Sequence, residues 1–145
     1  MTNIPVNEFR RILRNFEREL NFQNQSGCCC GVTITQCHTL MELVLKDNVT
    51  VNELAKRLHL DKSTVSRTID NLVQADLVGR EIPLSNRRTT RIKLTEKGHS
   101  FCKTINEGNN QYFLKALHAI PSEKLVDFIQ SFEKFTNEMI RLNYK

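Results

Sequence analysis

Sulfur-bearing side chains are concentrated in one short stretch of this 145-residue chain. Four of the five cysteines lie between positions 28 and 37, namely Cys28, Cys29, Cys30 and Cys37, and His38 follows the last of them. Thiolates alone bind soft species such as trivalent arsenic or antimony, monovalent copper, cadmium or mercury, and an added imidazole favours zinc. Exposed thiolates are also oxidised reversibly. The cluster therefore predicts a soft-metal, metalloid, zinc or redox site.

A predicted helix positions Cys37. Thr33 and Gln36 fit a capping box, so a helix begins at about Thr33 and places Cys37 in its first turns, where the positive end of the helix dipole favours a thiolate. Successive side chains diverge, so one or two residues of Cys28–Cys30 together with Cys37 form a better ligand set than all three neighbours. Cysteines that only pack are the alternative, because a thiol also behaves as a small hydrophobe.

Two short helices joined by a tight turn are predicted in the middle of the chain. Thr50 and Glu53 fit a capping box, and Asp61 supplies a second N-cap. At the turn, His59 is expected to tolerate a left-handed backbone, and Leu60 is expected to fill the space beneath. Apolar residues recur at helical spacing at Leu54, Ala55, Leu58, Val65, Ile69, Leu72 and Val73. Together these features predict a helix-turn-helix motif.

Polar and basic side chains gather near the N-terminus of the second of these helices. They are Lys62, Ser63, Thr64, Ser66 and Arg67. In a helix-turn-helix this end enters the major groove of DNA. Hydroxyls bond phosphates or base edges, and an arginine makes a bidentate contact to guanine or grips a phosphate. The alternative is an ordinary solvated helix face.

A hairpin rich in cations follows. Residues 77–82 and 89–94 are runs of strand-forming residues around a tip that contains proline, serine and asparagine. Its cations are Arg80, Arg87, Arg88, Arg91 and Lys93, and its only acidic residue is Glu81. This imbalance favours contact with a phosphate backbone or a minor groove. Helix-turn-helix and hairpin together predict a winged helix-turn-helix, mainly α with a small β-hairpin.

Three stretches of the sequence resemble the MarR family of bacterial transcription regulators. They are VNELAKRL at 51–58, DKSTVSRTIDNLVQADL at 61–77, and Asn86-Arg87-Arg88 followed by LTEKG at 94–98. The resemblance implies a DNA-binding dimer and, through its two-fold symmetry, a palindromic operator with half-sites about 34 Å apart. Asn86 stands where the family usually has an aspartate that orients the second arginine.

The family resemblance also bears on the sulfur cluster. Some MarR-type regulators bind zinc, and His38 resembles one of their ligands in its Thr-Gln-x-His setting. The matching stretch of the long helix after the wing, 105–113, has no histidine, which favours a thiol site over that zinc site. Other members sense oxidants through a cysteine near the dimer interface, a role open to Cys37 or Cys102. His99 and His118 are interpreted as structural.

Apolar seams near both ends of the chain predict how it is assembled. Residues spaced three and four apart are Val6, Phe9, Leu13, Phe16 and Leu20, and then Leu125, Phe128, Phe132, Phe135, Met139 and Leu142. Such seams could dock on the chain itself, but with the DNA unit between them they suit a second copy. We therefore predict a single MarR-like domain over 1–145, with a DNA-binding part at 46–95 and dimerisation helices at 5–24 and 96–143.

The composition agrees with a nucleic-acid partner. The net charge of +5 favours a polyanion, and the sequence shows no membrane span or signal peptide, so we expect a cytoplasmic protein. Taken together, the patterns predict a regulator, most simply a repressor, whose DNA affinity responds to a metal, metalloid or oxidant at the cysteines. A regulator of small aromatic ligands with structural cysteines is the first alternative. A thiol-based metal carrier or redox enzyme is the second, but it lacks a Cys-x-x-Cys pair, and no enzyme is expected.

Overall fold

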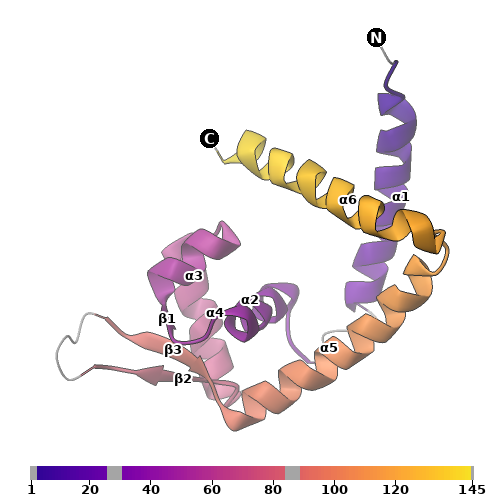
Figure 1. The fold of residues 1–145 in the computed structure, drawn as a ribbon. Coiled ribbons are helices and arrows are strands. Elements are labelled where there is room, and N and C mark those ends of the chain that lie inside the picture. The colour runs from indigo at the N-terminus through magenta and orange to yellow at the C-terminus, as the bar shows by residue number, and fades with distance from the viewer. Residues whose placement is uncertain (1–2, 26–30, 84–88, 145) are drawn as a thin grey trace.

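The computed structural model describes residues 3–25, 31–83 and 89–144 as helices around a small sheet (Figure 1). The elements are α1 (Val6–Gln25), α2 (Ile34–Leu45), β1 (Val49–Thr50), α3 (Val51–Leu58), α4 (Lys62–Gln74), β2 (Val78–Glu81), β3 (Arg91–Leu94), α5 (Glu96–Leu117) and α6 (Ser122–Asn143). The predicted fold class, mainly α with a winged helix-turn-helix, is confirmed. Within the described ranges, no helix has the length and apolarity needed to cross a bilayer.

The predicted helix starts are confirmed by hydrogen bonds at their caps. The Thr33 hydroxyl accepts from the Gln36 N–H at 3.1 Å, and the Gln36 side chain accepts from the Thr33 N–H at 2.9 Å, which completes the capping box of α2. The Thr50 hydroxyl accepts from the Glu53 N–H at 3.2 Å at the start of α3. These bonds satisfy N–H groups that have no partner within the helix.

The turn between α3 and α4 differs from the prediction in one side chain. His59 ends α3 in the left-handed region, with φ 54° and ψ 43°, as expected. Leu60, however, is 36% exposed and does not fill the space beneath the turn. Its backbone N–H donates to the Ala55 carbonyl at 3.0 Å, and the buried Leu54 and Val65 close the core there instead.

The sheet has one more strand than the sequence predicted. β2 and β3 form the expected antiparallel hairpin, with Val78 opposite Leu94. The two-residue β1 pairs with the other edge of β3, so the order is β1-β3-β2. Because β1 leads directly into α3, this pairing fixes the helix-turn-helix to the base of the wing.

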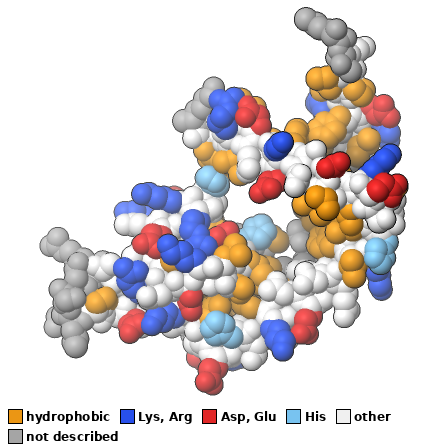
Figure 2. Space-filling model, viewed as in Figure 1, with side chains coloured by type: hydrophobic (Ala, Val, Ile, Leu, Met, Phe, Trp, Pro, Cys, Tyr) orange, Lys and Arg blue, Asp and Glu red, His pale blue; other side chains and the backbone are white. Residues whose placement is uncertain are grey.

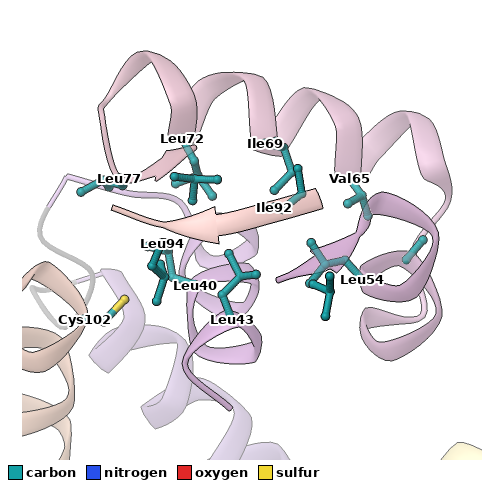
Figure 3. Packing of buried hydrophobic residues seen from close by; sticks show 13 residues of the cluster. Leu40, Leu43, Leu54, Val65, Ile69, Leu72, Leu77, Ile92, Leu94 and Cys102 are labelled. Carbon is teal, nitrogen blue, oxygen red and sulfur yellow. The ribbon is translucent and has the colours of Figure 1, made fainter. Parts of the chain in front are cut away.

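One hydrophobic core joins the winged unit to α2 and α5 (Figure 3). Its largest fully buried members are Leu40, Leu43, Leu54, Ile69, Leu72 and Ile92. α4 contributes every third or fourth residue, so its opposite face stays exposed. Cys102 of α5 is 1% exposed and belongs to this core.

The first turn of α5 is bonded to the corner between α4 and β2. The Thr95 hydroxyl donates to the Asp76 carbonyl at 2.6 Å, and the Thr95 N–H donates to the Leu77 carbonyl at 3.1 Å. The Lys97 ammonium donates to the Ala75 carbonyl at 3.0 Å. Three bonds to three consecutive residues make this corner a rigid junction, so a displacement of α5 would carry α4 with it.

The two apolar seams meet each other but stay largely uncovered. Phe9 of α1 packs edge-to-face on Phe135 of α6 with ring centroids 5.0 Å apart, and Phe16 packs similarly on Phe132 at 6.1 Å. No residue of either helix is buried. Hydrophobic side chains gather over α1 and the adjoining part of α6 (Figure 2). A patch of this kind on a folded chain marks a contact surface.

Candidate nucleic-acid interface

The N-terminal half of α4 presents the predicted DNA-contacting residues away from the core. Lys62, Ser63 and Arg67 are exposed, whereas Thr64 and Ser66 are half-buried. The residues between them on the other face, Val65, Thr68, Ile69 and Leu72, are buried. The helix therefore offers a polar edge that begins at its N-terminus, which is the arrangement that a major groove accepts.

A hydrogen-bond network organises the first turn of α4. The Asp61 carboxylate accepts from the Thr64 N–H at 3.0 Å, from the Thr64 hydroxyl at 2.6 Å and from the Ser63 hydroxyl. The hydroxyls of Ser63 and Thr64 and the Thr64 backbone hold the pKa of the Asp61 carboxyl well below its usual range. Both hydroxyl protons are thus directed at Asp61, and their lone pairs stay available to a partner.

The depressed pKa predicts an acid-labile cap. Since the folded-state pKa of Asp61 is lowered, the stabilisation is present above the ordinary aspartate pKa of about 3.9 and is lost as the pH falls below it. We expect the melting temperature of the wild type to fall more steeply below pH 4 than that of Asp61→Asn, which keeps a capping oxygen but does not titrate. Thermal unfolding from pH 7 to pH 3 measures this, and parallel curves would contradict it.

In the described part of the wing, three cations are engaged with the winged unit itself. The Arg80 guanidinium pairs with the Asp70 carboxylate of α4, and the Lys93 ammonium lies 2.6 Å from a Glu81 oxygen. The Arg91 guanidinium donates to the Asn48 carbonyl at 2.9 Å, at the turn between α2 and β1. Arg80 and Arg91 are therefore held in place at the base of the wing.

Two predicted contacts of the wing tip, Arg87 and Arg88, lie outside the described residues, as does Asn86. Sequence reasoning missed the acidic partner of Arg80, because Asp70 is ten positions away and on another element. It also missed the Asn48 carbonyl. Asn48 has a φ of 60°, and the Asp47-Asn48 pair before β1 was the available turn signal.

The described part of the sulfur cluster does not form a metal site on its own. Cys37 lies in the first turns of α2, as predicted, but it is 4% exposed and packs against Ile105 of α5. His38, the next residue, is exposed, so the two side chains face different surroundings. Cys28, Cys29 and Cys30 lie outside the described residues. Among the residues that are described, no three His, Cys, Asp or Glu side chains are grouped to hold a metal ion.

The remaining cysteine is a core residue. Burial raises the pKa of the Cys102 thiol, so at neutral pH it stays protonated and a poor nucleophile. Cys37 on α2 and Cys102 on α5 are thus two separate buried thiols on neighbouring helices.

The model of the MarR family matches residues 32–90, which span α2, the helix-turn-helix and the wing. Similar solved structures extend the likeness to nearly the whole chain. A MarR family protein from Bacillus stearothermophilus is 25% identical with a TM-score of 0.81, and the match covers 97% of this chain and 99% of that one. Residues 32–90 thus match the MarR family, and the chain as a whole shares the fold of a MarR family protein.

Two further structures share the fold at lower identity. FabT of Streptococcus pneumoniae, solved in complex with DNA, is 18% identical with a TM-score of 0.78, covering 95% of this chain and 97% of that one. Wild-type MarR of E. coli in its apo form is 19% identical with a TM-score of 0.69, covering 92% and 98%. The helices flanking the winged unit therefore belong to the shared fold.

Proposed function

We propose that the chain is a homodimeric repressor that inserts the N-terminus of α4 into the major groove of a palindromic operator, and that thiol chemistry at Cys37 controls its DNA affinity. The observation that carries the DNA part is the exposed edge of Lys62, Ser63 and Arg67 beside a basic wing. In this proposal 46–95 is the DNA-binding part of a single domain over 1–145.

The uncovered apolar seams support the homodimer. α1 and α6 have large exposed hydrophobics along the two seams, including Phe9 at 39%, Phe132 at 43% and Met139 at 44% exposed. A second copy that covers the helices at 5–24 and 96–143 would bury them and hold two α4 helices at a fixed separation. Sedimentation equilibrium tests this directly, since a monomer at micromolar concentration would contradict it.

The Asp61 network predicts how the first turn of α4 reads bases. Because the Ser63 and Thr64 hydroxyls donate to Asp61, they face DNA as acceptors. The donors in the major groove are the amino groups of adenine and cytosine, whereas guanine offers only acceptors there. Adenine or cytosine is therefore expected opposite Ser63 and Thr64, and guanine opposite Arg67.

Base analogues test whether the Ser63 and Thr64 hydroxyls accept hydrogen bonds from the bases. Replacing a contacted adenine by purine removes the amino donor and should weaken binding about three- to tenfold, the effect of one hydrogen bond. Replacing it by 7-deazaadenine removes only an acceptor and should leave the affinity unchanged. In Ser63→Ala the purine effect at the Ser63 position should disappear. The opposite ranking of the two analogues in the wild type would show that the hydroxyls donate.

The packing of Cys37 offers a route from thiol chemistry to DNA. Cys37 contacts α5 at Ile105, and the beginning of α5 is bonded to the corner that ends α4. The Cys37 side chain is only 4% exposed. A soft ion that replaces the thiol proton, or oxidation of the thiol, enlarges this side chain beyond the space that it now occupies. The effector would thus favour a second arrangement of α2 and α5, and it shifts DNA affinity by its preference for that arrangement.

The test is DNA binding by fluorescence anisotropy with arsenite, zinc and, separately, peroxide. We expect at least one agent to release the wild type from DNA upstream of its own gene, and Cys37→Ser to abolish that release. Cys102→Ala is the matched control, because its thiol is buried and protonated, and it should respond as the wild type does. Release that survives Cys37→Ser would contradict the switch while leaving the DNA-binding proposal intact.

A small aromatic effector is a second candidate, favoured by one observation. Phe9, Phe128, Ser131, Phe132 and Phe135 line an open hollow of about 210 Å³ between α1 and α6. In that case a phenolic ligand releases DNA equally from the wild type and from Cys37→Ser. This result distinguishes an aromatic effector from the thiol mechanism.

A further inference from the structure

The end of the C-terminal helix touches the turn of the helix-turn-helix. The Tyr144 ring lies on the His59 ring with centroids 4.3 Å apart and an angle of 13° between the planes, which is a stacked pair. The two residues are far apart in the sequence and belong to the two functional halves of the chain. Figure 1 shows α6 running back from the α5–α6 corner so that the C-terminus lies next to α3.

Helix ends hold both rings in place. The Tyr144 N–H donates to the Ile140 carbonyl at 3.0 Å, so the ring follows the last turn of α6. His59 is the C-cap of α3, and its N–H donates to the Ala55 and Lys56 carbonyls. His59 is also two positions before Asp61, the N-cap of α4. The stack therefore acts on the turn that sets the position of α4.

The winged unit is thus attached to the α5–α6 arm at two separate points. At one point the first turn of α5 is bonded to the corner after α4, through Thr95 and Lys97. At the other, Tyr144 contacts the turn before α4. The rigid junction ties the C-terminal end of α4 to α5, and the stack ties the turn before α4 to the last turn of α6. Two attachments at opposite ends of α4 restrain rotation of the winged unit relative to α6.

We infer that Tyr144 is a positioning residue that fixes the orientation of α4 relative to the dimerisation helices, and so the half-site spacing that the dimer accepts. The inference rests on the proposed dimeric binding to a palindrome. Loss of the ring should lower the affinity for the optimal operator and broaden the range of spacings that bind. A residue that merely stabilised α6 would lower affinity equally at every spacing.

The experiment measures the affinity of the full chain for operators whose half-sites are separated by the optimal spacing and by two additional base pairs. Tyr144→Ala should bind the optimal operator about fivefold more weakly, the equivalent of one aromatic pair. The affinity of each protein falls when the operator is lengthened. This fall should be at least threefold smaller for Tyr144→Ala than for the wild type. Tyr144→Phe keeps the ring and should match the wild type at both spacings.

His59→Asn removes the other ring of the stack, because asparagine tolerates the left-handed backbone of the turn and lacks the ring. Its affinities for the two operators should match those of Tyr144→Ala, and the double variant should bind no more weakly than either single variant. If the wild type prefers one spacing and Tyr144→Ala shows the same preference, the positioning role is wrong. If the wild type prefers no palindrome at all, the proposed function itself is wrong.

Discussion

Gly98→Ala is expected to lower the free energy of unfolding by about 3 kcal/mol, the cost of forcing a methyl group into a packed site. A Cβ at this position would lie 2.0 Å from the Leu77 carbonyl oxygen and 3.3 Å from a Leu94 methyl group. The first contact is with backbone, so the α4–β2 corner or α5 must move. The same corner carries the junction bonds of Thr95, so DNA affinity should fall as well.

Gly108→Ala is the matched control within the same helix. A Cβ there meets nothing within 4 Å, so removing the flexibility of glycine should stabilise the chain by about 0.5–1 kcal/mol. Thermal unfolding of the three proteins measures both effects, and Gly98→Ala should melt on the order of 10 °C below the wild type. Equal melting temperatures for the two variants would show that α5 does not pack on the α4–β2 corner as described.

Arg67→Ala is expected to weaken operator binding about 10- to 100-fold, the range for losing a bidentate contact to a base. The Arg67 side chain is exposed on α4 and has one long hydrogen bond, 3.5 Å from a guanidinium nitrogen to the Thr64 hydroxyl. It is therefore free to reach a base edge at little cost. Selection of operators from random DNA should show relaxed preference at one position of each half-site.

Lys62→Ala is the control for Arg67→Ala. An exposed lysine at the helix N-terminus suits a phosphate, so its loss should weaken binding to all sequences alike and reduce the salt slope by about one. Anisotropy titrations at several salt concentrations measure both quantities. Unchanged base preference in Arg67→Ala would show that this side chain grips the backbone rather than a base.

The local parts of this fold were predictable because short-range chemistry specifies them. The caps Thr33, Thr50 and Asp61 and the left-handed turn at His59 each depend on residues within about one helical turn. The polar edge of α4 follows from its 3.6-residue period for the same reason. A sequence pattern records such contacts directly.

The unpredicted features all depend on contacts between distant segments. β1 has two residues, too few for any alternating pattern, and exists because β3 has a free edge. The Arg80–Asp70 pair and the Tyr144–His59 stack join different elements, and no local periodicity signals them. Leu60 was misplaced for the same reason, because its exposure depends on how the neighbouring helices close the core.

The sulfur site was predictable in position and not in environment. The capping box of Thr33 placed Cys37 in the first turns of α2, but no local pattern indicated that Ile105 of α5 would cover it. That contact changes the chemistry expected of Cys37. An effector must open the contact between Cys37 and Ile105 to reach the sulfur. Because Ile105 belongs to α5, opening this contact also acts on α5.

Sequence-selective DNA binding is the central claim, and a direct comparison of two duplexes tests it. The affinity of the full chain would be measured by fluorescence anisotropy for DNA upstream of its own gene and for a scrambled duplex of equal composition, both at about 150 mM salt. We predict a preference of at least about 1,000-fold for the native duplex, the lower range for specific DNA-binding proteins. Equal affinity for the two duplexes would contradict the account.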